Sequence, residues 1–254
     1  MFQAYVWGRQ SLVQLADREG RSLGWVRQQL DQAKPMSVAT VPQPTVVAVD
    51  TTFWGRHYGV TVFRSPILKQ NLWWDEIELE TPEVYARGRF ELEQQGWRIA
   101  AAVIDGKRGV NRVFGDIPVQ ICQFHQIKTV TKYLTRRPKT QAGWELRRLT
   151  LELARSTETT FSVQLAVWHK NWKDFLNERT PCPCCKPSRW PYTHRKLRAA
   201  HRSLITNLPY LFTYQKYPEL NIPNTTNCLD GMFSQIKNRL AVHRGLKRDR
   251  RYKL

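Results

Sequence analysis

Two apolar runs that each end in an aspartate constrain the fold of this chain more than any other feature. Val46–Asp50 and Trp97–Asp105 are both typical of buried central strands. Between them, Thr81–Glu83 supplies a cap, a first-turn proline and an acid, so we expect a helix from there to about Gln95. A strand-helix-strand passage implies a crossover between parallel strands. Asp50 and Asp105 are then expected at neighbouring strand ends, where open α/β sheets bind ligands.

The remaining pattern extends this sheet and adds helices. Residues 58–63 and 68–79 are predicted as two strands in an antiparallel meander with the first. Residues 118–123 are predicted as a further strand that leads into a helix near Phe124. We therefore expect an α/β fold with a mixed sheet flanked by helices. Its predicted parts are a core at 46–139, an all-helical basic insertion at 140–220, and a completing helix with a basic tail at 221–254.

Residues 1–34 are predicted to form a helix-turn-helix. Ser11 starts a first helix that ends at Glu19, Gly20 supplies the turn, and Ser22 caps a second helix that runs to about Ala33. The second helix of such a motif enters the DNA major groove. A plain helical hairpin with a solvated basic face fits the same spacing. The prolines of 35–45 indicate a linker. The candidate DNA contacts in this part are Arg18, Arg21, Arg27 and Gln28.

The charge balance indicates a polyanionic partner. The 254 residues contain 40 Lys and Arg against 21 Asp and Glu, a net charge of +19, for which nucleic acid is the default explanation. No apolar run reaches the ~20 residues that span a bilayer, and the start of the chain lacks the charged and apolar regions of a signal peptide. Five cysteines argue against a secreted disulfide framework, so we expect a cytoplasmic protein without membrane partners. The candidate phosphate contacts in the insertion and tail are Arg195, Lys196, Arg198, Arg202, Lys237 and Arg244.

The stretch 224–240 is predicted to be a helix that carries a third acid. Asn227 is a good N-cap, and an apolar stripe begins at Leu229 and Phe233. Asp230 falls in the first turn. Taken alone, such an acid is more often a charge that favours the positive helix end than a catalytic residue.

Two groups of cysteine and histidine residues require separate interpretations. Cys122 and His125 provide two of the about four ligands that zinc needs, so we expect His125 to lie beside the acids, contacting a phosphate or orienting a ligand. The alternative is a buried cysteine and a helix-capping histidine. The second group, at 182, 184 and 185 with His194 or His201 further on, lacks the usual zinc spacing. Zinc binding and free thiols both remain open for the cysteines Cys182, Cys184 and Cys185.

Three acids on separate elements suit phosphoryl transfer assisted by two metal ions. Two such ions, ~4 Å apart, activate a nucleophile and stabilise the leaving oxygen. Mg²⁺ prefers oxygen ligands, which carboxylates supply. Mutual repulsion among Asp50, Asp105 and Asp230 would be relieved by the ions. No Ser-His-Asp or nucleophile-elbow pattern provides a covalent alternative.

Five short motifs, in this order, resemble the Mutator-like DDE transposases of bacterial insertion sequences. They are Val49–Asp50, Val103–Gly106, Cys122–His125, Asn224–Gly231 and His243–Leu246. The resemblance covers nearly the whole chain and implies a ribonuclease H-like core with a helical insertion before the last acid. It also implies Asp50, Asp105 and Asp230 as catalytic ligands of two Mg²⁺ or Mn²⁺ ions, with Cys122 and His125 at the active site. Asp230 departs from the family, whose third acid is typically Glu and one methylene longer.

The resemblance implies a bacterial, nucleoid-associated enzyme that cuts the ends of an insertion sequence and joins them to target DNA. Its partners would be double-stranded DNA, as terminal repeats and as target, and further copies of the chain in a dimer or higher assembly. One alternative is a decayed or repurposed transposase that only binds DNA. Another is a ribonuclease H-like nuclease that cuts without joining.

Overall fold

A single mixed sheet organises the molecule. The computed structural model describes all residues except 34–40, 56, 185, 187–188 and 243–254. Its strands are β1 (Pro44–Phe53), β2 (Gly59–Ser65), β3 (Gln70–Ile77), β4 (Arg98–Ile104) and β5 (Val119–Ile121). They lie in the order β3-β2-β1-β4-β5. The pairs β1–β2 and β2–β3 are antiparallel, whereas β1–β4 and β4–β5 are parallel. The predicted α/β class with a mixed sheet is confirmed.

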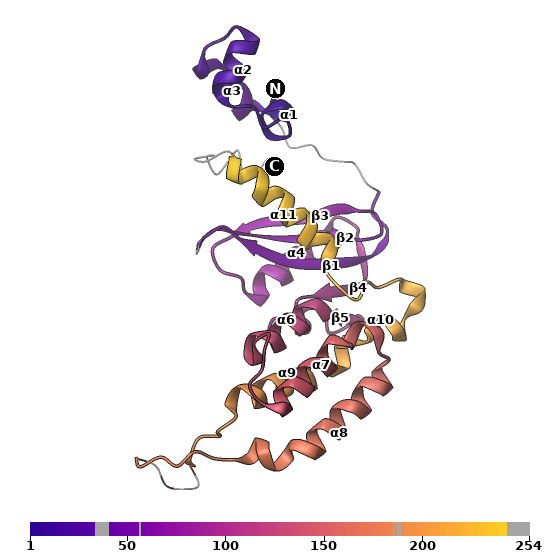
Figure 1. Ribbon diagram of the computed structural model, residues 1–254. Helices are drawn as coiled ribbons and strands as arrows, with labels where there is room; N and C mark the ends of the chain where they lie inside the picture. The colour runs from indigo at the N-terminus through magenta and orange to yellow at the C-terminus, as the bar shows by residue number, and fades with distance from the viewer. Residues whose placement is uncertain (34–40, 56, 185, 187–188, 243–254) are drawn as a thin grey trace.

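Helices precede, flank and follow this sheet (Figure 1). The first group is α1 (Phe2–Val6), α2 (Leu12–Glu19) and α3 (Leu23–Gln32). Around the strands come α4 (Pro82–Gln94), α5 (Val110–Val113) and α6 (Gln123–Leu134). The predicted helical insertion contains α7 (Gln141–Leu151), η1 (Leu153–Arg155), α8 (Glu158–Asn177), α9 (Arg195–Leu211), α10 (Thr213–Lys216) and η3 (Pro218–Leu220). The last described helix is α11 (Asn227–Val242), drawn in yellow across the sheet in Figure 1.

The predicted crossover is present and brings the two acids to neighbouring strands. Helix α4 leads from β3 to β4, and β4 pairs in parallel with β1. The pairing of β1 with β4 reaches Ala48 and Val103, and Asp105 is the first residue after β4. The prediction that Asp50 ends its strand was wrong, because β1 continues to Phe53 through its pairing with β2.

Strand β1 begins earlier than expected. Pro44 and Thr45 pair with β4, so the predicted linker of 35–45 ends too late. Pro44 is exposed and is the first residue of the strand, a position that a proline can occupy without breaking the ladder of hydrogen bonds.

The alternation of side chains along β1 separates two cores. Val47 and Val49 face the larger core, which includes α4 and the helices of the insertion. Val46 and Ala48 face the opposite side, where they pack with Leu229 and other apolar residues of α11. Since successive side chains of a strand point to opposite faces, Asp50 belongs to the face that α11 covers. The apolar stripe predicted for the last helix thus fixes which side of the sheet receives Asp50.

The helix pair at the N-terminus has the predicted boundaries and caps. Ser11 and Gln14 form a reciprocal capping box, and Gly20 ends α2 in the left-handed conformation with φ 62°. The Ser22 side chain accepts the Trp25 N–H at the start of α3. The buried residues of α2 and α3 form a small core of their own together with α1. The five residues of α1 were not predicted, because a segment that short has no readable helical period.

Gly88 marks the closest approach of α4 to the sheet. A Cβ atom at this position would lie 2.7 Å from ring atoms of Phe63 and Trp73. We expect Gly88→Ala to lower the free energy of unfolding by about 1–3 kcal/mol, measured by urea denaturation, because overpacking outweighs the gain in helix propensity. In Gly24→Ala of α3, where the nearest atom would be 3.8 Å away, the same change is expected to be neutral or to stabilise by up to ~1 kcal/mol. Equal effects at the two glycines would contradict this view of the packing.

Candidate metal centre

Three side chains from different elements converge beside the C-terminal half of β1. One ligand atom from each of Asp50, His125 and Asp230 lies within 4.8 Å of the others. Asp50 comes from β1, His125 from the first turn of α6, and Asp230 from the first turn of α11. The structure thus joins two of the three predicted metal ligands, and the histidine expected beside the acids lies among them.

Asp105 lies next to this group without being a member of it. Its Oδ1 atom accepts the N–H of Lys107 at 2.8 Å, in the loop that follows β4. The Lys107 Nζ atom pairs with Glu80 at 2.8 Å. Burial raises the pKa of Asp105, and the charge of Glu80 raises it further. The charge of Asp105 also raises the pKa of Asp50. Asp105 is therefore close enough to the three-residue group to influence its electrostatics.

Burial and the proximity of several acids shift the pKa values of this group. Burial raises the pKa of Asp50 to about 7, against the lowering influence of His125, and the charges of Asp105 and Asp230 raise it further. The pKa of His125 is raised to about 9, first by its interaction with Cys122 and also by Asp50 and Asp105. Gathering carboxylates in this way costs free energy, which a bound cation offsets.

An unsatisfied oxygen shows that the group fits a metal ion. Asp230 Oδ2 is shielded from solvent and has no hydrogen-bond partner among the described residues. A buried carboxylate oxygen without a partner is costly, and coordination to a cation supplies the missing partner. Two carboxylates and one imidazole form a donor set that can hold a divalent ion. The imidazole distinguishes this set from the all-carboxylate triad that the sequence predicted.

Hydrogen bonds join the start of α6 to the residues just before α11. The Thr226 N–H and Oγ1–H donate to the Cys122 Sγ atom at 3.3 and 3.4 Å. In return, the Gln123 N–H donates to the Asn224 carbonyl at 2.9 Å. Thr226 Oγ1 also lies 3.4 Å from His125 Nδ1. Cys122 is therefore a buried acceptor that ties together the two helices carrying His125 and Asp230.

Thr226 also corrects the predicted cap of the last helix. Helix α11 begins at Asn227, and the Leu229 and Asp230 N–H groups donate to the Thr226 carbonyl. The cap position therefore belongs to Thr226, and the prediction of Asn227 was wrong by one residue. The run of Asn and Thr before the helix offers several good caps, so the local sequence does not specify which of them begins the helix.

We expect Thr226→Val to lower the free energy of unfolding by about 1 kcal/mol, because it removes the hydroxyl while keeping the shape of the side chain. Urea denaturation measures the change. Thr226→Ser is the matched control, since it keeps the hydroxyl, and it should retain a larger share of the stability than the Val variant. A Val variant that is more stable than the Ser variant would show that the hydroxyl does not join α6 to α11.

Glu80 and Lys107 are further residues near Asp105 that sequence reasoning missed. Glu80 lies just before the predicted cap at Thr81, and Lys107 follows Asp105 by two residues. Each lies close to a predicted strand or helix boundary, and this position is the only feature of the sequence that could have indicated a place near the site. Their ion pair depends on the relative position of two loops that are far apart in the sequence.

The predicted DNA contacts of the N-terminal helices are exposed, and Arg18, Arg21 and Arg27 also interact within the protein. Arg18 pairs with Glu19 and donates to Gln10. The Arg21 guanidinium lies 5.7 Å from the ring centre of Trp25. Arg27 and Gln28 are exposed on α3, the helix predicted to enter the major groove.

The other predicted DNA contacts lie on α9 and α11. Arg195, Lys196 and Arg202 are exposed on α9, whereas Arg198 is half-buried. Lys237 is exposed on α11, with its Nζ atom 5.9 Å from the ring centre of Trp54. Arg244 lies outside the described residues.

The second cysteine group does not join the histidines considered with it. The sulfur atoms of Cys182 and Cys184 lie 2.8 Å apart, and Cys185 lies outside the described residues. His194 Nε2 contacts Glu178 at 2.9 Å, and the ring of His201 stacks on that of His169. In the described part of the chain, the one group of three or more potential ligands is therefore that of Asp50.

None of the helices in the described ranges combines the length and apolar character needed to cross a bilayer. No protein-family model matches the chain, and neither a curated protein nor a solved structure matches it.

Proposed function

We propose that the protein is a DNA transposase of the type that uses a cluster of acids, and that it cuts and joins DNA strands by metal-dependent phosphoryl transfer. One observation carries the proposal: Asp50, His125 and Asp230 present their ligand atoms within 4.8 Å of one another beside β1. The mixed five-stranded sheet, with one acid in β1, one directly after β4 and one on a late helix, is compatible with a ribonuclease H-like fold. Basic surfaces on the same chain supply the means to hold DNA.

Asp50, Asp230 and His125 would hold a divalent ion, Mg²⁺ or Mn²⁺. When bound, such ions activate a nucleophile and stabilise a leaving oxygen in phosphoryl transfer. Asp105 would help to hold a second ion, because its charge is close enough to Asp50 to raise the pKa of that residue. Asp230 is one methylene shorter than the glutamate typical of the resembled family. Its carboxylate nevertheless comes within 4.8 Å of its partners, which favours a working ligand set.

The chain's own cations position the DNA relative to this centre. Lys237 follows Asp230 by seven residues on α11, about 10 Å along the helix axis, so it can hold a backbone phosphate beside the reacting one. The net charge of +19 favours DNA at long range and makes binding dependent on salt. Arg27 and Gln28, which are exposed on α3, would contact base edges of an element end.

A strand-transfer assay tests the proposal. The substrate is double-stranded DNA that carries the inverted repeats flanking the coding region, supplied with target DNA and Mg²⁺ or Mn²⁺. We expect joined products. Cleavage without joining would favour the nuclease alternative, and binding without cleavage would favour a non-catalytic DNA-binding protein. In Asp105→Ala, cutting should disappear while DNA binding remains, and retained cutting would remove Asp105 from the site.

A further inference from the structure

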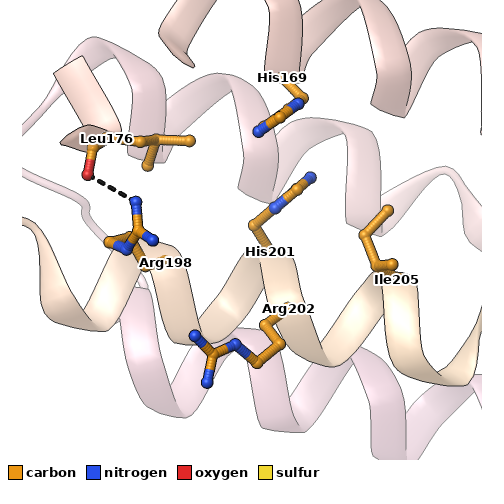
Figure 2. Close-up of a pocket in the computed structure, with 6 residues that line it drawn as sticks. All are labelled: His169, Leu176, Arg198, His201, Arg202 and Ile205. Carbon is orange, nitrogen blue, oxygen red and sulfur yellow. Dashed lines mark hydrogen bonds between the residues drawn. The ribbon is translucent and has the colours of Figure 1, made fainter. Parts of the chain in front are cut away.

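A second candidate site lies in the helical insertion, between α8 and α9. A pocket of about 200 Å³ opens there. Its lining consists of His169 and Leu176 from α8 and Arg198, His201, Arg202 and Ile205 from α9. Figure 2 shows the two imidazole rings facing each other across the space between the helices, with Arg198 near the end of α8. Four of the six lining side chains are basic and none is acidic.

One ring nitrogen in this pocket has no partner. His201 Nε2 is shielded from solvent and makes no hydrogen bond among the described residues. The rings of His169 and His201 stack with their centres 4.7 Å apart and their planes 5° apart. A buried ring nitrogen without a partner is costly, and a ligand that supplies the missing hydrogen bond removes this cost.

Arg198 is fixed at the pocket by contacts that leave its charge unneutralised. Its Nη1 atom donates to the Leu176 carbonyl at 2.9 Å and to Asn177 Oδ1 at 3.0 Å, as the dashed line in Figure 2 marks for the first. The guanidinium also lies 3.6 Å from the ring centre of Tyr192. Neither Arg198 nor Arg202 belongs to an ion pair within the described parts of the chain.

The charge environment of the histidine pair favours an anion. Burial lowers the pKa of His201 to about 4, and the neighbouring His169 and Arg198 lower it further. His201 is therefore neutral near pH 7, and a negative group placed beside Arg198 and Arg202 would stabilise these two cations. Guanidinium groups are well suited to phosphate, because several N–H donors point in one direction.

We propose that this pocket binds a single phosphate group, with Arg198 and His201 as inner donors and Arg202 at the rim. The same chemistry is offered by a phosphodiester of DNA and by free phosphate. Binding of a DNA phosphodiester rests on the proposed function. In that case the helical insertion would hold the DNA backbone at a point outside the metal centre. The phosphate site itself does not depend on transposition.

Nuclear magnetic resonance of the protein tests the site, because two of its six histidines, His169 and His201, line the pocket and their imidazole signals can be followed separately. One sample is titrated with inorganic phosphate and another with a short double-stranded oligonucleotide. We expect saturable shifts of the His169 and His201 signals. In Arg202→Gln, the affinity for phosphate should fall by about fivefold. Lys170→Gln removes an equal charge from an exposed position of α8 outside the pocket and should change the affinity by less than about twofold.

The outcomes distinguish DNA from free phosphate as the ligand. They also distinguish failure of the phosphate site from failure of the proposed function. Shifts with the oligonucleotide assign the pocket to DNA, and shifts with inorganic phosphate alone assign it to a free phosphate. If neither probe shifts these two signals, or if Arg202→Gln and Lys170→Gln weaken binding equally, the site is overturned. An intact phosphate response in a protein that fails to cut or join DNA would remove the proposed function and leave the pocket in place.

Discussion

Replacing Asp50 with Asn is expected to slow metal-dependent DNA cleavage by about a thousandfold, equivalent to ~4 kcal/mol of lost transition-state stabilisation. The substitution keeps the size of the side chain and removes one negative charge from the ligand set of Asp50, His125 and Asp230. The measurement is the initial cleavage rate on element-end DNA. Binding of the same DNA, followed by fluorescence anisotropy, should change little because the basic surfaces are untouched.

Asp174→Asn is the matched control for this prediction. Asp174 is an exposed acid on α8 and undergoes the same chemical change. Its cleavage rate should stay near that of the unchanged protein. Equal cleavage by the Asp50 and Asp174 variants would remove Asp50 from the reaction.

Adding Mn²⁺ or Mg²⁺ is expected to stabilise the folded protein by about 2.7 kcal/mol at a metal concentration one hundred times the dissociation constant. The ion would bind the folded chain, where the carboxylates of Asp50 and Asp230 meet, and unfolding would separate them. It would also supply the partner that Asp230 Oδ2 lacks. Urea denaturation with metal and with a chelator measures the difference.

In Asp230→Asn, most of this stabilisation should be lost, because the neutral amide is a weaker ligand than the carboxylate. The metal-free variant should be at least as stable as the unchanged protein, since a buried, crowded charge has been removed. Asp174→Asn should keep the full response to the metal. A response that is equal in the two variants would place the ion elsewhere.

Much of the sheet and part of the site follow from local patterns. The apolar runs before Asp50 and Asp105 specify buried strands, and the helix opened by Thr81 and Pro82 forces the crossover that makes those strands parallel. The apolar stripe through Leu229 then places the last helix on the sheet. These features follow from the local hydrophobic pattern and from the handedness of crossover connections, so they can be predicted from a single sequence.

The composition of the ligand group depends on contacts that a sequence does not contain. Asp105 and His125 both lie near Asp50, and only the packing of α6 against the start of α11 brings the histidine into the group. The role of Cys122 as an acceptor for Thr226 likewise joins residues 104 positions apart. Short elements such as α5, with four residues, give no periodic signal and were missed.

The histidines of the insertion illustrate the same limit. His194 and His201 were considered as partners of the cysteine group because they are near it in the sequence. The structure instead pairs His194 with Glu178 and stacks His201 on His169 across two helices. Proximity in the sequence was a poor guide there, because His194 precedes α9 and contacts Glu178, whereas His201 lies within α9 and faces His169.

The most direct test of the metal centre is a crystal structure of the protein grown with Mn²⁺, in which anomalous scattering locates the ion. We predict a peak with oxygen atoms of Asp50 and Asp230 and a ring nitrogen of His125 at roughly 2.1 Å, the distance typical of small divalent ions. A second peak shared by Asp50 and Asp105 is expected if two ions bind. A structure in which Mn²⁺ binds elsewhere, and leaves Asp50 and Asp230 without a metal contact, would contradict the account.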